Sequence, residues 1–241
     1  ERTTSFLLFI LGVLTRPLCS VKYKTEKMKT TFFKSIILGL FVVAFISSAY
    51  AGNTVKESKE NNSAVNVLIV GLDNVGSNYF PESMITEETG IPQDSIGDTY
   101  NRIITQNIIQ SNKNKEFKFI SSQNLKGVEN LIDKVKLNGK DEDTYVDLSQ
   151  IKTEDYNKLL TEAHADYILF LNKHYLKWQE QPFHTLFHFV SYSLYDKNCK
   201  EVTKGNNYFT CMNLEKADKL GKASWKSSSK IATTVIKSIE K

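Results

Sequence analysis

The residues best suited to metal or acid–base chemistry are four histidines, His164, His174, His184 and His188. His184 and His188 are four residues apart, a spacing that places two zinc ligands on one face of a helix. However, the surrounding segment 183–195 (FHTLFHFVSYSLY) is aromatic and β-branched, which predicts a strand. On a strand the two rings would lie about 13 Å apart, too far for one metal ion. We therefore predict no metal site and expect both histidines on the polar side of the strand, partly exposed.

Carboxylates could support hydrolysis if two of them faced each other across a cleft. Several lie between residues 82 and 98, and an acidic trio occupies 141–143, which we interpret as a solvated loop with weak calcium binding as the alternative. The spacing selects no pair, and the chain has no Gly-x-Ser-x-Gly nucleophile elbow. We predict that the protein is not an enzyme, and keep a carboxylate-dependent exported hydrolase as the alternative function.

The segment from Gly71 to Gly76 (GLDNVG) follows an apolar run, where backbone amides could approach a phosphate. No lysine follows Gly76 to reach the phosphates, and the third glycine of a dinucleotide fingerprint is missing. The two glycines are therefore interpreted as a strand end and a turn, and we expect no cofactor.

Two cysteines, Cys199 and Cys211, flank the turn-forming triplet 205–207 (Gly-Asn-Asn). If that triplet turned a hairpin, the two thiols could face each other and form a disulfide. The alternative is two free, buried thiols. Either arrangement would serve stability and not catalysis.

The elements that must position these residues follow from the apolar periodicity. Strands are expected at 65–72, 117–121, 167–171 (continuing toward Trp178), 183–195 and 201–211. Helices are expected at 98–110, 153–164 and 214–239, with a weaker helical stretch at 125–137 and a polar surface loop at 139–149. The main order β-α-β-α-β-β-α predicts a single α/β (α+β) domain with a mixed sheet, residues 65–241.

Two helices carry a clear inner face and a candidate cap. In 98–110, Asp98 is the expected N-cap and the inner residues are Tyr100, Ile103, Ile104, Asn107 and Ile108. In 153–164, Thr153 is the expected cap and the inner residues are Tyr156, Leu159, Leu160 and Ala163.

The connection from Asp73 to Gly97 is longer than most loops of a compact domain and has no structural need for that length. Such loops often carry function. It bears two aromatic and several acidic side chains, and the candidates for binding a partner are Tyr79, Phe80, Glu87 and Glu88. The other aromatic concentration, along 183–195, is interpreted as core packing, with a partner-binding patch as the alternative.

The N-terminal part has the pattern of a bacterial export signal. Residues 28–51 combine basic Lys29 and Lys34 with an apolar run and a small-x-small cleavage site, Ala49-Tyr50-Ala51, before Gly52. Residues 52–64 have the composition of a flexible tether. Residues 1–27 are interpreted as an untranslated or over-extended leader. We expect a periplasmic or secreted protein with no stable membrane span after cleavage, and an uncleaved anchor is the alternative.

Removing the leader changes the charge. Seven of the 31 basic and two of the 27 acidic residues precede Gly52, which leaves 24 and 25 and a net charge near zero. Arg102 is the one arginine after Gly52. Nucleic-acid surfaces favour arginine, so no nucleic-acid partner is expected.

Three segments resemble a family of bacterial envelope domains: VNVLIVGLDN (65–74), EAHADYILFLNKHYLK (162–177) and FHFVSYSLYDKNCKEV (187–202). The family includes the curli-export lipoprotein domain, the N-terminal domain of the Tol β-propeller protein and the lipoprotein activators of peptidoglycan synthases. Ala165-Asp166-Tyr167 matches its strand start and Asp196 its hairpin turn. The long loop and the missing lipoprotein cysteine depart from it. The resemblance implies a non-enzymatic binding or assembly module whose partner is an envelope protein or a cell-wall component.

Overall fold

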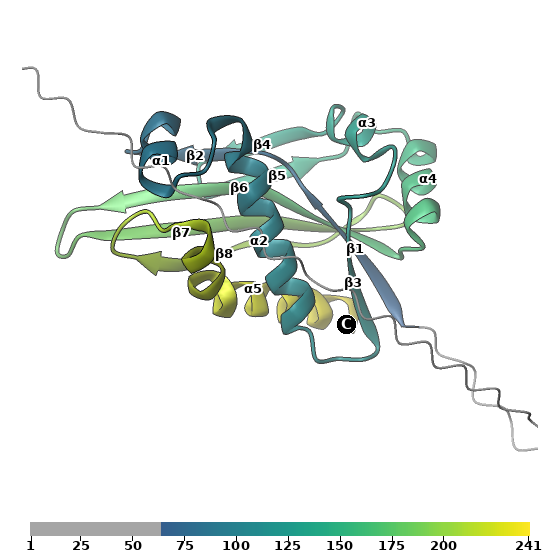
Figure 1. Ribbon diagram of the computed structural model, residues 1–241. Coiled ribbons are helices and arrows are strands. Elements are labelled where there is room, and N and C mark those ends of the chain that lie inside the picture. The colour runs from purple at the N-terminus through teal and green to yellow at the C-terminus, as the bar shows by residue number, and fades with distance from the viewer. Residues whose placement is uncertain (1–63) are drawn as a thin grey trace, which may run out of the picture. The chain divides into compact units, whose positions relative to one another are not determined.

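The computed structural model describes residues 64–241, so the predictions for 1–27, for the signal peptide 28–51 and for the tether up to residue 63 lie outside the described residues. Six strands form one sheet in the order β3-β1-β6-β7-β8, with β2 paired to β6 (Figure 1). These strands are β1 (Val65–Gly71), β2 (Val75–Ser77), β3 (Phe117–Ser121), β6 (Tyr167–Gln179), β7 (Thr185–Asp196) and β8 (Glu201–Cys211). A separate hairpin and the helices complete the fold: β4 (Lys136–Lys140), β5 (Asp143–Asp147), α1 (Glu82–Thr89), η1 (Gln93–Ser95), α2 (Ile96–Ser111), α3 (Val128–Ile132), α4 (Thr153–Ala163) and α5 (Ala217–Ile239).

One half of the sheet is parallel and the other antiparallel, so the predicted α/β class with a mixed sheet is confirmed. β1 pairs in parallel with both β3 and β6. Parallel neighbours need crossover connections, which α2 provides between β1 and β3, and α4 between β3 and β6. β6, β7 and β8 then form an antiparallel meander of long strands.

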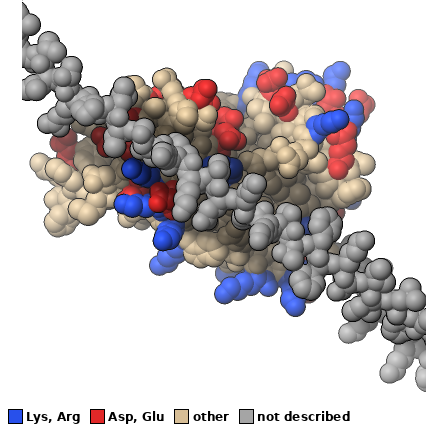
Figure 2. Space-filling view, viewed as in Figure 1, with Lys and Arg blue, Asp and Glu red and all other residues tan. Residues whose placement is uncertain are grey.

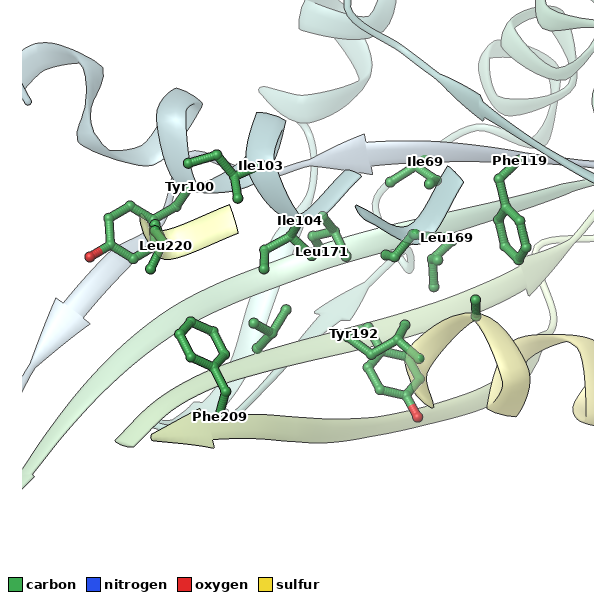
Figure 3. Close-up of a cluster of buried hydrophobic side chains, with 14 of the residues drawn as sticks. Ile69, Tyr100, Ile103, Ile104, Phe119, Leu169, Leu171, Tyr192, Phe209 and Leu220 are labelled. Atoms are coloured by element: carbon green, nitrogen blue, oxygen red, sulfur yellow. The ribbon is translucent and has the colours of Figure 1, made fainter. Parts of the chain in front are cut away.

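Both faces of the sheet carry apolar side chains, which come from alternate positions along each strand. One core lies under α2 and α5, where Tyr100, Ile104 and Leu220 pack against the sheet (Figure 3). The other lies under α3, α4 and β5 and includes Tyr156 and Tyr195. The side chains of β7 are divided between the two cores, since Leu186, Val190, Tyr192 and Leu194 face the first core while Tyr195 faces the second.

Several predicted boundaries are wrong. α2 begins at Ile96, so Asp98 lies inside its first turn, and α4 has Lys152 and not Thr153 as its N-cap residue. The inner faces of both helices are buried as predicted. Within 125–137 only α3 is helical, and the expected surface loop at 139–149 is the β4–β5 hairpin, because Thr144 and Val146 alternate inward between polar neighbours.

The C-terminal helix runs without a break through its serine cluster. Ser224 donates its hydroxyl to the Leu220 carbonyl and Ser228 donates to the Ser224 carbonyl, so both buried hydroxyls are satisfied within the helix. These small side chains allow α5 to lie close to α2, where Asn107 donates to the Gly221 carbonyl and to Ser224.

Candidate functional site

The long connection after β1 is a structured flap that is closed at its base. Gly97 packs directly on Asp73, and a Cβ on Gly97 would stand 2.9 Å from the Asp73 Cα. The sequence predicted a long loop here, but the segment contains β2, α1 and η1. β2 forms because β6 is much longer than β1 and leaves backbone groups at His174–Leu176 that β2 pairs with.

Hydrogen bonds of Ser77 and Asn78 hold the flap to β6. The Ser77 hydroxyl donates to the Leu176 carbonyl and accepts from the amides of Tyr79 and Phe80. The Asn78 side chain pairs with the backbone of Trp178 in both directions, at 3.1 and 2.7 Å. The two aromatic residues after Asn78 are therefore held next to the end of β6.

Four rings from three segments form a cluster there, which we call the aromatic tip: Tyr79, Phe80, Trp178 and His184. The Trp178 ring stacks on Tyr79 at 6.0 Å between centroids and meets Phe80 edge-on at 5.8 Å. The His184 ring lies tilted to that of Trp178, with 5.7 Å between the centroids. Offset and edge-on contacts of this kind contribute more stabilising free energy than their buried area alone, so they hold the four rings in a defined arrangement.

A shallow pocket of about 170 Å³ opens beside the aromatic tip. Three of the four predicted partner-binding residues, Tyr79, Phe80 and Glu88, line it, whereas Glu87 lies exposed on α1 outside the lining. The remaining lining residues are Met84, Trp178, Asn213 and Leu214. Sequence reasoning missed Trp178, because the pairing of Asn78 with a residue one hundred positions later leaves no signal in a single chain.

Exposed large apolar side chains gather at this end of the molecule. Phe183, in the turn between β6 and β7, is 77% exposed, and Met212, just after β8, is 76% exposed. Tyr79 is 55% exposed and Met84 36%. Figure 2 shows this end, on the left, as mostly uncharged surface. Isolated exposed apolar residues are ordinary, whereas a concentration of them is unusual on a folded domain.

The sheet face opposite the tip is also aromatic at this end. Phe187, Phe189 and Tyr208 form a triangle with centroid distances of 6.1, 5.6 and 5.3 Å. The Lys177 ammonium lies 5.9 Å from the Phe189 ring and 2.6 Å from the Glu142 carboxylate. The acidic trio 141–143 is therefore not simply a solvated loop, since Glu142 and Asp143 bind residues of β6 and β8.

The prediction that both histidines are at least partly exposed is correct for His184 and wrong for His188. His184 is exposed as expected, but His188 is buried in the core under α2, stacked on Phe209 at 4.5 Å. His174 is buried as well and donates from Nε2 to the Asn101 side-chain oxygen at 2.9 Å. Desolvation lowers the pKa of His174 to about 4, and desolvation together with the nearby His174 lowers that of His188 to about 3. Residues 64–241 contain no group of three or more His, Cys, Asp or Glu side chains that could hold a metal ion.

The hairpin on which a disulfide between Cys199 and Cys211 depended does not form, and both cysteines are free, as in the second alternative. The triplet 205–207 lies in the middle of β8 and turns no hairpin. Cys199 precedes the first residue of β8 and Cys211 is its last residue, so the two cysteines lie at opposite ends of the strand. Twelve residues of extended chain span about 40 Å, whereas a disulfide needs Cα atoms about 6 Å apart. Both thiols are half-buried, and desolvation raises the pKa of Cys211 to about 11.

Comparison with known proteins finds weak similarity to solved structures. No protein-family model and no curated protein matches the chain. A hypothetical protein from Chlamydia trachomatis has TM-score 0.36 and 11% identity, over 61% of this chain and 73% of its own. The PelC dodecamer from Paraburkholderia phytofirmans has TM-score 0.33 and 9% identity, over 70% and 86%. The LpoB C-terminal domain from Salmonella enterica has TM-score 0.28 and 11% identity, over 63% and 87%. Within the described part, no helix is both long and apolar enough to cross a bilayer.

Proposed function

We propose that this chain is an exported, non-enzymatic binding or assembly module of the bacterial cell envelope that recognises a partner protein through the aromatic tip. The observation that carries the proposal is the concentration of exposed apolar side chains at one end. Tyr79, Met84, Phe183 and Met212 gather there beside a small pocket. The export-signal pattern of residues 28–51 supports the location.

The aromatic tip suits recognition because it is already ordered. The Asn78–Trp178 hydrogen bonds and the ring contacts fix Tyr79 and Trp178, so binding costs little side-chain entropy. Buried aromatic anchors at the centre of an interface carry most of its energy. The pocket has room for one apolar side chain, and Glu88 in its lining favours a neighbouring basic residue on the partner.

The alternative, a carboxylate-dependent hydrolase, has weaker support. The loop carboxylates Glu82, Glu87, Glu88 and Asp94 are all solvent-exposed. A general acid needs burial to raise its pKa toward neutrality. Exposed carboxylates on α1 and η1 suit the charged border of an interface better than an acid–base pair.

Export is tested by fractionating cells that produce the native chain and measuring the mass of its N-terminus. We expect a protein that starts at Gly52 in the periplasmic or secreted fraction, because Ala49-Tyr50-Ala51 is a small-x-small cleavage site. A chain that keeps Met28 in the membrane fraction would contradict the signal-peptide interpretation.

The aromatic tip is tested by placing a photo-crosslinking phenylalanine at Phe183 or Tyr79 in cells, with Trp225 on α5 as an exposed aromatic control. We expect Tyr79 in the aromatic tip and the neighbouring exposed Phe183 to crosslink one envelope protein, and Trp225 not to. With that protein purified, Tyr79→Ala and Trp178→Ala should each weaken binding at least tenfold, and Trp225→Ala less than twofold. Crosslinks of equal yield at all three positions, or affinities that the tip variants leave unchanged, would refute the assignment.

A further inference from the structure

A second feature lies at the base of the flap, at the carboxyl ends of the parallel strands. β1 and β3 are parallel neighbours that end at Gly71 and Ser121. From β1 the chain passes to α2 on one face of the sheet, and from β3 it passes to α3 and α4 on the other. Where neighbouring parallel strands send their connections to opposite faces, a crevice opens, and ligands of open α/β sheets bind there.

The structure has such a crevice, with a volume of about 220 Å³. Its lining is mostly polar and comes from the ends of both strands, from α2 and from α3. The charged and hydrogen-bonding residues that matter here are Asp73, Asp98, Arg102, Ser121, Gln123 and Glu129. The site therefore offers a cation, carboxylates and neutral hydrogen-bonding groups within one small volume.

Asp73 is held in place by a buried network. The Asn101 amide, 6% exposed, donates to the Asp73 carboxylate at 2.7 Å and accepts from the buried His174 ring. Gly71 allows this contact, since a Cβ at that position would stand 2.5 Å from the Asn101 side chain. One oxygen of Asp73 is thus fixed from the protein side, while the residue as a whole remains exposed.

Arg102 is half-buried in the crevice and forms no ion pair with any residue in 64–241. Asp98 lies four residues earlier on the same helix, at a spacing where opposite charges usually pair. The planar guanidinium matches a carboxylate through two parallel hydrogen bonds. Its donors are therefore available to a ligand.

We propose that this crevice binds a small zwitterion, such as an amino acid or a short peptide, with its carboxylate on Arg102 and its ammonium group on Asp73 and Asp98. Ser121 and Gln123 supply hydrogen bonds between the two ends. This site is separate from the aromatic tip, and it goes beyond the proposed recognition of a protein partner.

The test uses the purified, isotope-labelled full chain and three probes: dialanine, N-acetyl-dialanine, which lacks the ammonium charge, and dialanine amide, which lacks the carboxylate. We expect saturable amide shifts at Ser121–Gln123 with dialanine, and at least tenfold weaker binding of both analogues. Arg102→Gln should weaken dialanine binding at least tenfold without changing the melting temperature. Lys118→Gln, an exposed cation on β3, is the matched control and should change affinity less than twofold.

Three results would overturn the proposal. N-acetyl-dialanine binding as tightly as dialanine would show that Arg102 attracts any anion. Shifts confined to residues outside the crevice would place the ligand elsewhere. The absence of saturable shifts with all three probes would show that the crevice does not take this class of ligand. Tyr79→Ala should leave dialanine binding unchanged, so this test and the test of the tip fail independently.

Discussion

The free energy of unfolding is expected to fall by about 4 kcal/mol between pH 6.5 and pH 4.5, through two buried histidines. Desolvation lowers the pKa of His174 to about 4 and that of His188 to about 3, while an unfolded histidine titrates near 6.5. The unfolded chain therefore takes up protons first as the pH falls. Stability is complete above pH 6.5 and is lost down to the folded pKa values, at up to about 1.4 kcal/mol per pH unit for each ring.

The measurement is chemical denaturation at a series of pH values between 7.5 and 4.5. His188→Phe should remove about half of the pH dependence and leave stability at pH 7 equal or higher. Neither ring nitrogen of His188 has a hydrogen-bond partner in residues 64–241, so an apolar ring of similar shape loses no hydrogen bond. His184→Phe changes an exposed histidine in the same way and should leave the pH dependence intact. An unchanged slope in His188→Phe would show that this ring does not titrate as a buried group.

Local pattern predicted the elements whose residues repeat with one period. The strand β1 follows from an apolar, β-branched run, and the inner face of α2 follows from Tyr100, Ile103, Ile104 and Ile108 at helical spacing. β7 follows from an aromatic and β-branched run. In each of these, the side chains that face the core are enough to define the element, so a single sequence carries the signal.

Contacts between distant segments could not be predicted in this way. β2 forms in the flap because β6 extends beyond the end of β1. The exposed backbone of β6 also binds the side chains of Ser77 and Asn78, which hold the flap in place. His188 looked polar and half-exposed, but α2 covers its face of the sheet and leaves the ring against Tyr100 and Phe209. Among the residues that line the pocket beside the aromatic tip, the length of the loop predicted Tyr79, Phe80 and Glu88. Trp178 could be identified only from the three-dimensional structure.

Gly71→Ala is expected to cost about 3 kcal/mol of stability, an effect that should nearly vanish when Asn101 is also shortened. A Cβ at position 71 would stand 2.5 to 2.8 Å from the Asn101 side chain, including its own Cβ, which cannot swing away. Asn101→Ala alone should cost about 2 to 3 kcal/mol, because His174 and Asp73 lose their shared partner.

The double variant decides whether this one contact sets the geometry at the end of β1. If the clash is with Asn101, Gly71→Ala should cost under about 1 kcal/mol in the Asn101→Ala background, a coupling of about 2 kcal/mol. Gly221→Ala is the matched control, since its nearest neighbour would be Ile103 at 4.0 Å, and alanine inside α5 should stabilise by about 0.5 to 1 kcal/mol. Equal costs of Gly71→Ala in both backgrounds would mean that the strand itself requires glycine there. A large coupling would instead show that the glycine at the end of β1 exists to admit Asn101, the residue that fixes Asp73 in the crevice.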